Sequence, residues 1–369
     1  MSGIPILNLH EQIEKLWPDI IPAIERVIRA GHFILGPEVQ AFEAEAARYL
    51  EVKYAIGVNS GTDALVIALR AAGIGPGDEV ITTPFTFFAT AEAVSTVGAE
   101  PVFVDVDPLT FNINPKLIEE AITPRTRVIL PVHLYGQAAD MDGIMAIARK
   151  YNLVVIEDVA QAFGGKWREK KLGTIGKLGC FSFFPTKNLS CFGDGGLVVT
   201  NDDDLAEQVR MLRAHGSKKK YHNEILGYNS RLDEIQAAIL RVKLPYVDKW
   251  NEARRRAAQR YHELLAGIPG LELPLEKETA YHVYHQYTIR IKQGKRDLLK
   301  ERLEKEGICT MIYYPIPLHK LPVYNRSEKY ANAEAAAGEV LSLPIWPEIT
   351  PAIQERVAAN IRRIMEEIG

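Results

Sequence analysis

Short apolar runs alternate with runs of helical pattern through the first half of this chain. The runs that we interpret as buried strands are residues 54–58, 79–83, 101–105, 128–134 and 153–157. Helical patterns separate them, at residues 64–72, 116–121 and 142–151 among others. Strands that alternate with helices pair in parallel and are covered on both faces, so the pattern predicts an α/β fold with a mainly parallel sheet. Ligands in such folds bind at the carboxyl ends of the strands.

The pattern changes near residue 245, and 369 residues are enough for two domains. A long charged helix is predicted at residues 245–265, and patterned runs follow at 284–291, 296–306, 309–313 and 353–368. We expect a large domain over residues 1–245 and a smaller C-terminal α+β domain over residues 246–369. The large domain includes an N-terminal helix at residues 13–30, which Pro18 or Pro22 could interrupt.

One lysine stands in an unusual setting, the stretch CFSFFPTKNLSCFGDGGLVV at residues 180–199. Pro185 and Asn188 argue against a helix through Lys187, so we expect a tight turn between two buried strands. An ammonium group held among aromatic side chains is destabilised by desolvation, which lowers its pKa and frees an amine nucleophile. Such an amine is what a Schiff-base lysine requires. Taken alone, a solvated lysine in a surface turn is the commoner arrangement.

Two further features lie at predicted strand ends. The sequence Asn-Ser-Gly-Thr-Asp at residues 59–63 joins a strand to a helix, where free backbone N–H groups and the helix dipole favour an anion. The alternative is an ordinary helix N-cap, because Ser and Thr cap helices routinely. Asp158 ends another strand, with Gln161 three residues later. An acid at a strand end in a predicted crevice favours a functional role.

These features together match the needs of pyridoxal phosphate. Its phosphate requires a helix N-terminus, its aldehyde a lysine, and its pyridine nitrogen a carboxylate. Asp158 would keep that nitrogen protonated, and the run Thr-Pro-Phe-Thr-Phe-Phe at residues 83–88 offers aromatic side chains to cover the ring.

Composition excludes several other classes of function. A formal net charge of −3 and a pI near 6.3 indicate no affinity for nucleic acid or for an anionic membrane surface. No apolar run approaches the length of a membrane span, and residues 1–17 lack the pattern of a signal peptide. We therefore expect a cytoplasmic protein.

Cysteine and histidine patterns indicate neither disulfides nor a metal site. Cys180, Cys191 and Cys309 are an odd number without CxxC pairing, so we expect reduced thiols. There is no HExxH motif, and the lone HxxH of His282 and His285 is more typical of a strand than of a metal site.

At this point the sequence resembles the DegT/DnrJ/StrS sugar aminotransferases, which have the fold type I architecture of aspartate aminotransferase. The resemblance covers nearly the whole chain. The matching stretches are NSGTDAL (59–65), TPFTFFATAEA (83–93), VHLYGQ (132–137), IEDVAQAFG (156–164), FSFFPTKNLSCFGDGG (181–196), GYNSRLDEIQAA (227–238) and YYPIPLH (313–319). Seven motifs in order are highly specific, where any one would be weak.

The resemblance implies a role for each matching residue at the cofactor. Lys187 binds pyridoxal phosphate covalently and then moves the proton between substrate and cofactor. Asp158 pairs with the pyridine nitrogen, Gln161 lies near the ring hydroxyl, and Phe87 stacks on the ring. The phosphate is held by Gly61, Thr62 and Ser182.

The resemblance also implies a homodimer with shared active sites, because Asn229 reaches the phosphate from the partner subunit. The residues expected to face the substrate are Arg231, Tyr313, Tyr314 and His319. For the two tyrosines the alternative is core packing of the small domain, and for His319 a surface loop.

The implied reaction moves an amino group from an amino acid, in this family usually L-glutamate, to a nucleotide-linked ketosugar. Phe184 and Asp194 resemble members that aminate 3-keto sugars, for example in polysaccharide assembly. Members acting on 4-keto sugars more often have other residues at these positions, which leaves that alternative open.

Three rival functions fit this sequence less well. Related sugar dehydratases carry histidine at the lysine position, so Lys187 argues against that class. A non-catalytic regulatory protein would be expected to lack Lys187 or Asp158, and a serine hydrolase would need a GxSxG motif, which does not occur.

Overall fold

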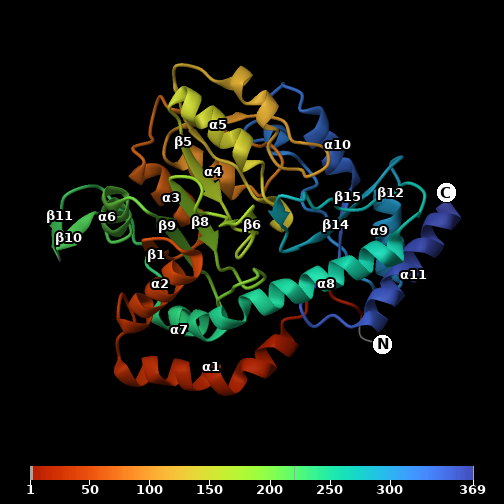
Figure 1. Ribbon diagram of the computed structural model, residues 1–369, viewed down its shortest axis with the longest axis horizontal. Coiled ribbons are helices and arrows are strands. Elements are labelled where there is room, and N and C mark those ends of the chain that lie inside the picture. Colours follow the sequence, from red (N-terminus) through yellow and green to blue (C-terminus); the bar gives the residue numbers. More distant parts are fainter. Residues whose placement is uncertain (1–2, 220, 369) are drawn as a thin grey trace.

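A seven-stranded sheet organises the computed structural model, which describes residues 3–219 and 221–368 (Figure 1). The strand order is β1-β9-β8-β5-β4-β2-β3. The strands are β1 (Tyr54–Val58), β2 (Glu79–Thr82), β3 (Glu100–Phe103), β4 (Thr126–Ile129), β5 (Val154–Asp158), β8 (Leu178–Ser182) and β9 (Gly196–Thr200). This architecture confirms the predicted α/β fold with a mainly parallel sheet.

Strand β9 departs from the parallel pattern, since it pairs antiparallel with both β8 and β1. It follows β8 through the loop at residues 183–195 and not through a helical crossover. A parallel neighbour needs a long crossover, whereas a loop that returns directly gives an antiparallel one. The predicted lysine turn is therefore part of a long loop that joins two adjacent buried strands.

Both faces of the sheet are buried, which explains why its strands are continuously apolar. Successive residues point to opposite faces, so Ile81, Val155 and Phe181 lie in one hydrophobic core. Their neighbours Val80, Ile156 and Cys180 lie in another. The helices of this part are α1 (His10–Ala30), α2 (Pro37–Leu50), α3 (Gly61–Ala71), α4 (Ala89–Thr96), α5 (Met141–Tyr151), α6 (Asp203–Leu212) and α7 (Glu234–Lys243).

Helix α1 runs without a break through both of its prolines. Pro18 and Pro22 are exposed to solvent, so water can satisfy the carbonyl groups that lack a helical partner. Its buried face packs against α7. The predicted helix at residues 116–121 is instead two short 3-10 turns, η1 (Pro115–Leu117) and η2 (Glu119–Ala121). The predicted strand over 128–134 ends earlier, and η3 (Leu134–Gly136) follows β4.

A separate hydrophobic core forms around a smaller sheet of three strands, β12 (Leu271–Glu272), β14 (Tyr287–Ile291) and β15 (Val340–Leu343). Helices α8 (Val247–Leu265), α9 (Arg296–Lys305) and α11 (Pro351–Ile368) belong to it, and α8 runs from the large sheet towards α11 (Figure 1). Ile4 from the N-terminus packs into this core and pairs with Ile308. The division at residue 245 stays a prediction.

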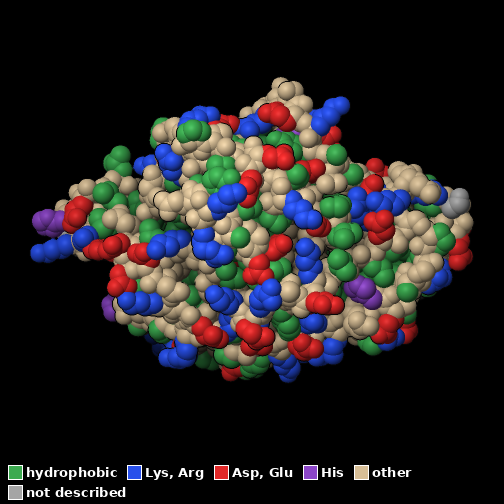
Figure 2. Space-filling model, turned by 45° about the horizontal axis from the view of Figure 1, so that its top comes forward, with side chains coloured by type: hydrophobic (Ala, Val, Ile, Leu, Met, Phe, Trp, Pro, Cys, Tyr) green, Lys and Arg blue, Asp and Glu red, His purple; other side chains and the backbone are tan. Residues whose placement is uncertain are grey.

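The remaining elements are short connections. They are β6 (Lys166–Trp167), β7 (Lys170–Lys171), β10 (Ser217–Lys219), β11 (His222–Asn223), β13 (Ala280–Tyr281), η4 (Leu244–Tyr246), η5 (Leu318–Lys320) and α10 (Ala331–Glu339). The β10–β11 pair projects from the body of the molecule (Figure 1). On the face shown in Figure 2, Lys and Arg side chains are interspersed with Asp and Glu. None of the helices within residues 3–219 and 221–368 is both long and apolar enough to span a membrane.

Candidate active site

A cavity of about 510 Å³ opens at the carboxyl ends of the parallel strands. The last residues of β5 and β8, and residues in the segments that follow β1 and β2, contribute to its wall. The predicted site residues that line it are Gly61, Thr62, Phe87, Asp158, Gln161, Ser182, Lys187, Tyr313 and Tyr314. The fold therefore brings together residues from five separate sequence motifs at the place where α/β folds bind ligands.

The N-terminus of α3 forms one end of the cavity. Ser60 is the N-cap, and its hydroxyl accepts a hydrogen bond of 3.0 Å from the backbone N–H of Asp63. The serine is thus an ordinary cap, while Gly61 and Thr62 in the first helical turn face the cavity. A Cβ on Gly61 would lie 2.5 Å from Cβ of Ser182, so only glycine allows this close approach. The resulting cradle has the free N–H groups and hydroxyls that bind phosphate.

Lys187 lies in the loop between β8 and β9, where its backbone N–H donates a hydrogen bond of 2.8 Å to the carbonyl of Phe184. The side chain is partly buried and lines the cavity. Burial lowers the pKa of Lys187 to about 8, although the charge of Asp158 opposes this change. The amine is therefore available as a nucleophile near neutral pH, as a Schiff-base lysine requires.

Asp158 is the last residue of β5 and is almost completely buried. Its Oδ1 accepts a hydrogen bond of 3.1 Å from the N–H of Ala160, and its Oδ2 accepts one of 2.9 Å from the hydroxyl of Thr90. Burial raises the pKa of Asp158, and these two hydrogen bonds and the charge of Lys187 act in the opposite direction. A desolvated carboxylate of this kind is stabilised by a cation next to it, such as a protonated ring nitrogen.

Gln161 connects the cavity to the segment that carries the two tyrosines. Its Oε1 accepts a hydrogen bond of 2.6 Å from the N–H of Tyr135, which leaves Nε2 to donate one of 2.9 Å to Oη of Tyr314. The Tyr135 hydroxyl in turn donates to the carbonyl of Tyr313. Tyr313 and Tyr314 pack against a small hydrophobic cluster and also line the cavity. Core packing and contact with a substrate are therefore compatible for these two residues.

Two large aromatic side chains at the cavity are unusually exposed. Phe87 is 58% exposed and Phe184 49% exposed. The ring centroids of Phe87 and Tyr314 are 6.1 Å apart. Both rings are therefore available to contact a molecule bound in the cavity.

Two predicted residues lie away from this cavity within the same chain. Asn229 is exposed near the base of the β10–β11 projection, where it pairs with Ala214. Arg231 is partly buried, and it is not among the residues that line the cavity. The contact of Asn229 with the phosphate of a partner subunit therefore stays a prediction.

His319, which is expected to face the substrate, is not among the residues that line this cavity, and its contact with the substrate stays a prediction. Its side chain is fully buried, and Nε2 lies 3.1 Å from Oε1 of Glu334. The imidazole ring packs edge-on against Tyr330. The turn η5 is tied to the large domain by a hydrogen bond from the N–H of Leu318 to the carbonyl of Pro84, which directs the imidazole inward. His319 therefore has a structural setting outside the cavity.

Sequence reasoning missed several residues that line the cavity, among them Thr90, His285 and Gln286. Thr90 stands within the motif at residues 83–93, but only its hydrogen bond to Asp158 shows that it belongs to the site. His285 was noted as part of an HxxH pair and interpreted as a strand residue. It lies in the loop before β14 and reaches the cavity from the small sheet's side.

A lowered pKa alone does not identify the site, as Lys243 shows. Burial also lowers the pKa of Lys243 to about 8. Its Nζ, however, donates hydrogen bonds to the carbonyl and hydroxyl of Ser190, at 2.8 and 2.9 Å. Lys243 lies outside the cavity. The combination of a desolvated lysine with an open cavity and a facing acid distinguishes Lys187.

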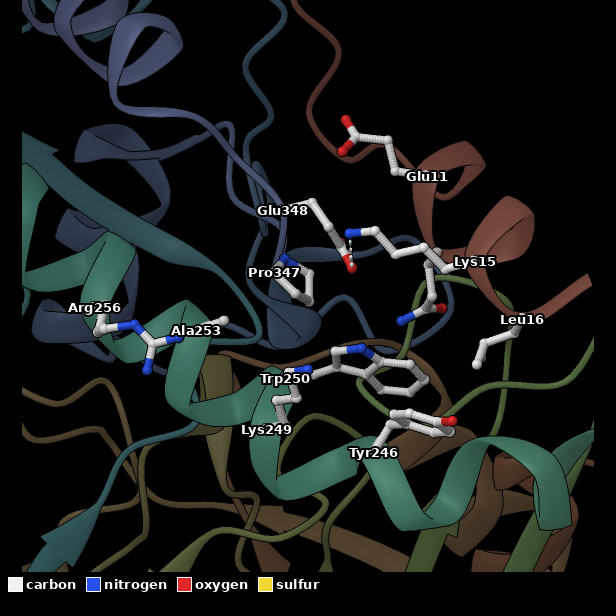
Figure 3. Close-up of a pocket in the computed structure, with 11 residues that line it drawn as sticks. Glu11, Lys15, Leu16, Tyr246, Lys249, Trp250, Ala253, Arg256, Pro347 and Glu348 are labelled. Atoms are coloured by element: carbon white, nitrogen blue, oxygen red, sulfur yellow. Dashed lines mark ion pairs between the residues drawn. The ribbon is translucent and has the colours of Figure 1, made fainter.

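A second cavity, of about 390 Å³, lies between α1, α8 and the segment at Pro347 and Glu348 (Figure 3). Trp250 and Tyr246 stack to form one wall, with ring centroids 5.7 Å apart. Lys15 and Glu348 form an ion pair of 3.6 Å within it. None of the site residues predicted from the sequence lines this cavity, so the larger one is the candidate active site.

The residues of the larger cavity fit pyridoxal phosphate. The close approach of Gly61 and Ser182 provides a phosphate cradle, Lys187 a free amine, and Asp158 a buried carboxylate. Among the residues that the structure describes, no group of three or more His, Cys, Asp or Glu side chains could hold a metal ion.

Comparison with known proteins gives consistent matches over nearly the whole length. The DegT/DnrJ/EryC1/StrS aminotransferase family matches residues 15–362. A pleiotropic regulatory protein of Geobacillus stearothermophilus is 52% identical, over 97% of this chain and 98% of its own. A UDP-N-acetyl-3-dehydro-alpha-D-glucosamine 3-aminotransferase of Acidithiobacillus ferrooxidans is 49% identical, over 99% of this chain and 98% of its own.

Among solved structures, Streptomyces venezuelae DesV in complex with a ketimine intermediate superposes with a TM-score of 0.96. It is 46% identical in sequence, and the match covers 99% of each chain.

Proposed function

Because the chain belongs to the DegT/DnrJ/EryC1/StrS aminotransferase family, we propose that its cavity transfers an amino group to the 3-keto position of a nucleotide-linked sugar. The observation that carries this proposal is the placement of Lys187 opposite Asp158 in one cavity, with the Gly61–Ser182 cradle at its end. The lysine, the acid and the cradle each have a common structural explanation when taken singly. Because all three meet at the carboxyl ends of the strands, a functional explanation is favoured.

Each residue of the set has a defined task. The amine of Lys187 would hold the cofactor through its aldehyde and, once free, would move a proton at the substrate carbon. The carboxylate of Asp158, held by Thr90 and Ala160, would pair with the ring nitrogen and keep it protonated. When bound, pyridoxal phosphate supplies an aldehyde that takes up the amino group and a ring that accepts electrons.

The 3-keto position is supported by the relatives and by two residues of the cavity. The Acidithiobacillus relative is named as a 3-aminotransferase of a 3-dehydro sugar nucleotide. Phe184 and Asp194, which favoured a 3-keto sugar in the sequence, both line the cavity. A side chain at the cavity wall can discriminate between the two carbonyl positions, whereas a distant one cannot.

The amino donor and the assembly are further parts of the proposal. L-Glutamate, the usual donor in this family, would deliver the amino group in the first half of the reaction. A cytoplasmic homodimer would place Asn229 of one subunit at the phosphate of the other. The exposure of Asn229 supports this part of the proposal, because its side chain is free to meet a second subunit.

The Geobacillus relative, whose name is that of a regulatory protein, raises a second candidate function. A regulatory protein without chemistry has no need for a lysine of lowered pKa beside a buried acid. Keeping such groups desolvated costs stability, which favours retained catalysis. Regulation and catalysis are not exclusive, and the experiment below separates them.

The test is a panel of half-reactions followed through the visible absorption of the bound cofactor. We expect L-glutamate to bleach the band, and a UDP- or dTDP-linked 3-keto sugar, generated in place, to restore it. Recovery only with 4-keto sugars would retain the family and overturn the 3-keto assignment. No bleaching by glutamate, alanine or glutamine would support the regulatory alternative.

A further inference from the structure

The second cavity, of about 390 Å³, has no part in the proposed reaction, yet several polar side chains line it (Figure 3). Its walls come from the first turns of α1, from α8 and from the segment after β15. The simplest explanation is a packing gap between these three segments. The side chains that face the cavity decide between such a gap and a binding site.

Gln12 presents to this cavity an amide group without a partner. The residue is only 8% exposed, it lines the cavity, and it makes no hydrogen bond within the part of the chain that the structure describes. A buried amide without a partner costs stability, so an apolar residue would suit a packing gap better. The amide offers both donors and an acceptor to a molecule bound in the cavity.

The aromatic wall of the cavity suits a flat ring. Trp250 stacks on Tyr246, with ring centroids 5.7 Å apart and an interplanar angle of 22°. In Figure 3 the indole of Trp250 lies between the ring of Tyr246 and the ion pair of Lys15 with Glu348. One face of the indole is therefore occupied by Tyr246, and the cavity lies on its other side. A flat ring bound in the cavity would extend this stack.

Two cations lie beside the aromatic wall on the same face of α8. Lys249, Ala253 and Arg256 are separated by four and three residues, which places them on one side of the helix. Lys249 is exposed and has no ion pair among the described residues. Arg256 has an exposed ion pair of 3.8 Å with Glu252. Ala253 between them is small, so it leaves space above the helix.

The charges that line the cavity favour an anion. Its three cations are Lys15, Lys249 and Arg256, and its two carboxylates are those of Glu11 and Glu348. Lys15 and Glu348 already pair at 3.6 Å. The net charge of the lining is therefore positive, and the cations of α8 are the ones available to a negatively charged group.

We propose that this cavity binds a nucleotide, with its base on Trp250 and its phosphate groups at Lys249 and Arg256. A planar base fills the space beside the indole, and its edge carries the donors and acceptors that the amide of Gln12 lacks. Phosphate oxygens form charge-assisted hydrogen bonds with the two cations. This cavity shares no lining residue with the candidate active site, so the inference does not depend on the proposed function.

The first test is equilibrium dialysis of the cofactor-loaded protein against ADP and UDP. Ribose 5-phosphate and pyrophosphate are the comparison ligands that lack a base. We expect both nucleotides to bind with a dissociation constant below about 1 mM. The comparison ligands should bind at least about ten-fold more weakly, because they lose the stacking of the base. No binding of either nucleotide would overturn the proposal. Equally tight binding of a ligand without a base would also overturn it, since the cavity would then recognise the anion alone.

A variant that fills the cavity tests where the nucleotide binds. Ala253→Leu places a larger side chain at the centre of the lining face of α8, and leucine suits a helix. We expect its affinity for both nucleotides to fall at least about ten-fold, because the ligand and the new side chain would overlap. Its half-reaction with L-glutamate should be unchanged, since Ala253 lies outside the candidate active site. Unchanged nucleotide affinity would mean that the nucleotide binds elsewhere and would overturn the proposal.

A charge reversal at the cavity avoids the risk that a filled cavity disturbs the packing of α1. Lys249→Glu should lower nucleotide affinity about ten-fold, the effect of one lost hydrogen bond to a charged group, whereas Lys249→Arg should bind as wild type does. Lys116→Glu, at an exposed lysine outside the cavity, changes the net charge equally and is the matched control. Equal losses in the two Glu variants would assign the effect to net charge and contradict the site. The assay uses neither amino donor nor sugar, so its failure is distinct from failure of the proposed function.

Discussion

The hydroxyl of Thr90 donates a hydrogen bond of 2.9 Å to Oδ2 of Asp158. Thr90 lies in the first turn of α4, so this bond ties the helix after β2 to the carboxyl end of β5. The hydroxyl of Thr86 lies 3.0 Å from that of Thr90 and extends the connection. The acid at the centre of the site is thus oriented by a side chain from a different strand–helix unit.

Replacement of Thr90 by Val should weaken cofactor binding. The variant keeps the shape and removes one of the two donors to Asp158, which leaves its charged form less stabilised. We expect the dissociation constant for pyridoxal phosphate, measured by equilibrium dialysis, to rise about ten-fold, the effect of one hydrogen bond to a charged group. Thr90→Ser retains the hydroxyl and is the control. Equal affinity of the Val variant and wild type would show that the bond is dispensable.

Gly61→Ala should disrupt the phosphate cradle. The new Cβ would meet Cβ of Ser182 at 2.5 Å, so β8 and the N-terminus of α3 must separate. We expect a loss of cofactor affinity of about ten-fold or more, because the phosphate depends on both. Gly338→Ala in the exposed part of α10 is a matched control, since nothing lies within 4 Å of its Cβ position. That variant should bind normally and be slightly more stable. If Gly61→Ala binds the cofactor as tightly as wild type does, the close approach of Gly61 and Ser182 does not contribute to phosphate binding.

Lys187→Met should stabilise the cofactor-free protein. The pKa of Lys187 is about 8 in the folded chain and 10.5 for an unperturbed lysine, so folding at neutral pH desolvates a charge. This penalty is complete below pH 8 and disappears as the pH rises from about 8 to 10.5, since only the unfolded chain then keeps the proton. We expect the variant's Tm to exceed that of wild type by about 2 °C or more at pH 7, with a smaller gain at pH 10. If the variant's Tm at pH 7 is lower than that of wild type, the desolvation penalty at Lys187 is contradicted.

The fold could be predicted from local patterns because each of its strands is covered on both faces. The first three residues of β5, Val154 to Ile156, are apolar at successive positions, which distinguishes a buried parallel strand from a half-exposed one. The direction of β9 could not be read in this way. Its apolar pattern is the same in either orientation, and only the length of the preceding connection decides between them.

The site was predictable where the chemistry requires one residue type in one motif, as for Lys187 and Asp158. It was not predictable where the role depends on a contact between distant segments. Thr90 is placed at the site by its bond to Asp158, and His285 reaches the cavity from a segment almost 100 residues beyond Lys187 in the chain. His319 was assigned to the substrate from its motif, but its environment buries it against Glu334. Sequence patterns indicate residue types, while the direction of each side chain follows from tertiary packing.

Complementation between a variant that lacks the nucleophile and one that binds the cofactor weakly tests whether the active sites are shared. Lys187→Ala removes the nucleophile, and we expect it to lower turnover at least 1,000-fold while the dimer stays folded. Asn229→Ala should weaken cofactor retention about ten-fold through the lost phosphate contact. If Asn229 serves the partner's phosphate, a hybrid of the two variants contains one site with both defects and one with none. Co-expressed, differently tagged subunits should therefore recover activity that neither variant has alone, at a cofactor concentration that saturates wild type but leaves the Asn229→Ala variant largely unloaded. Hybrids in which every site keeps one defect would show that Asn229 acts within its own subunit, or has no part in binding the phosphate.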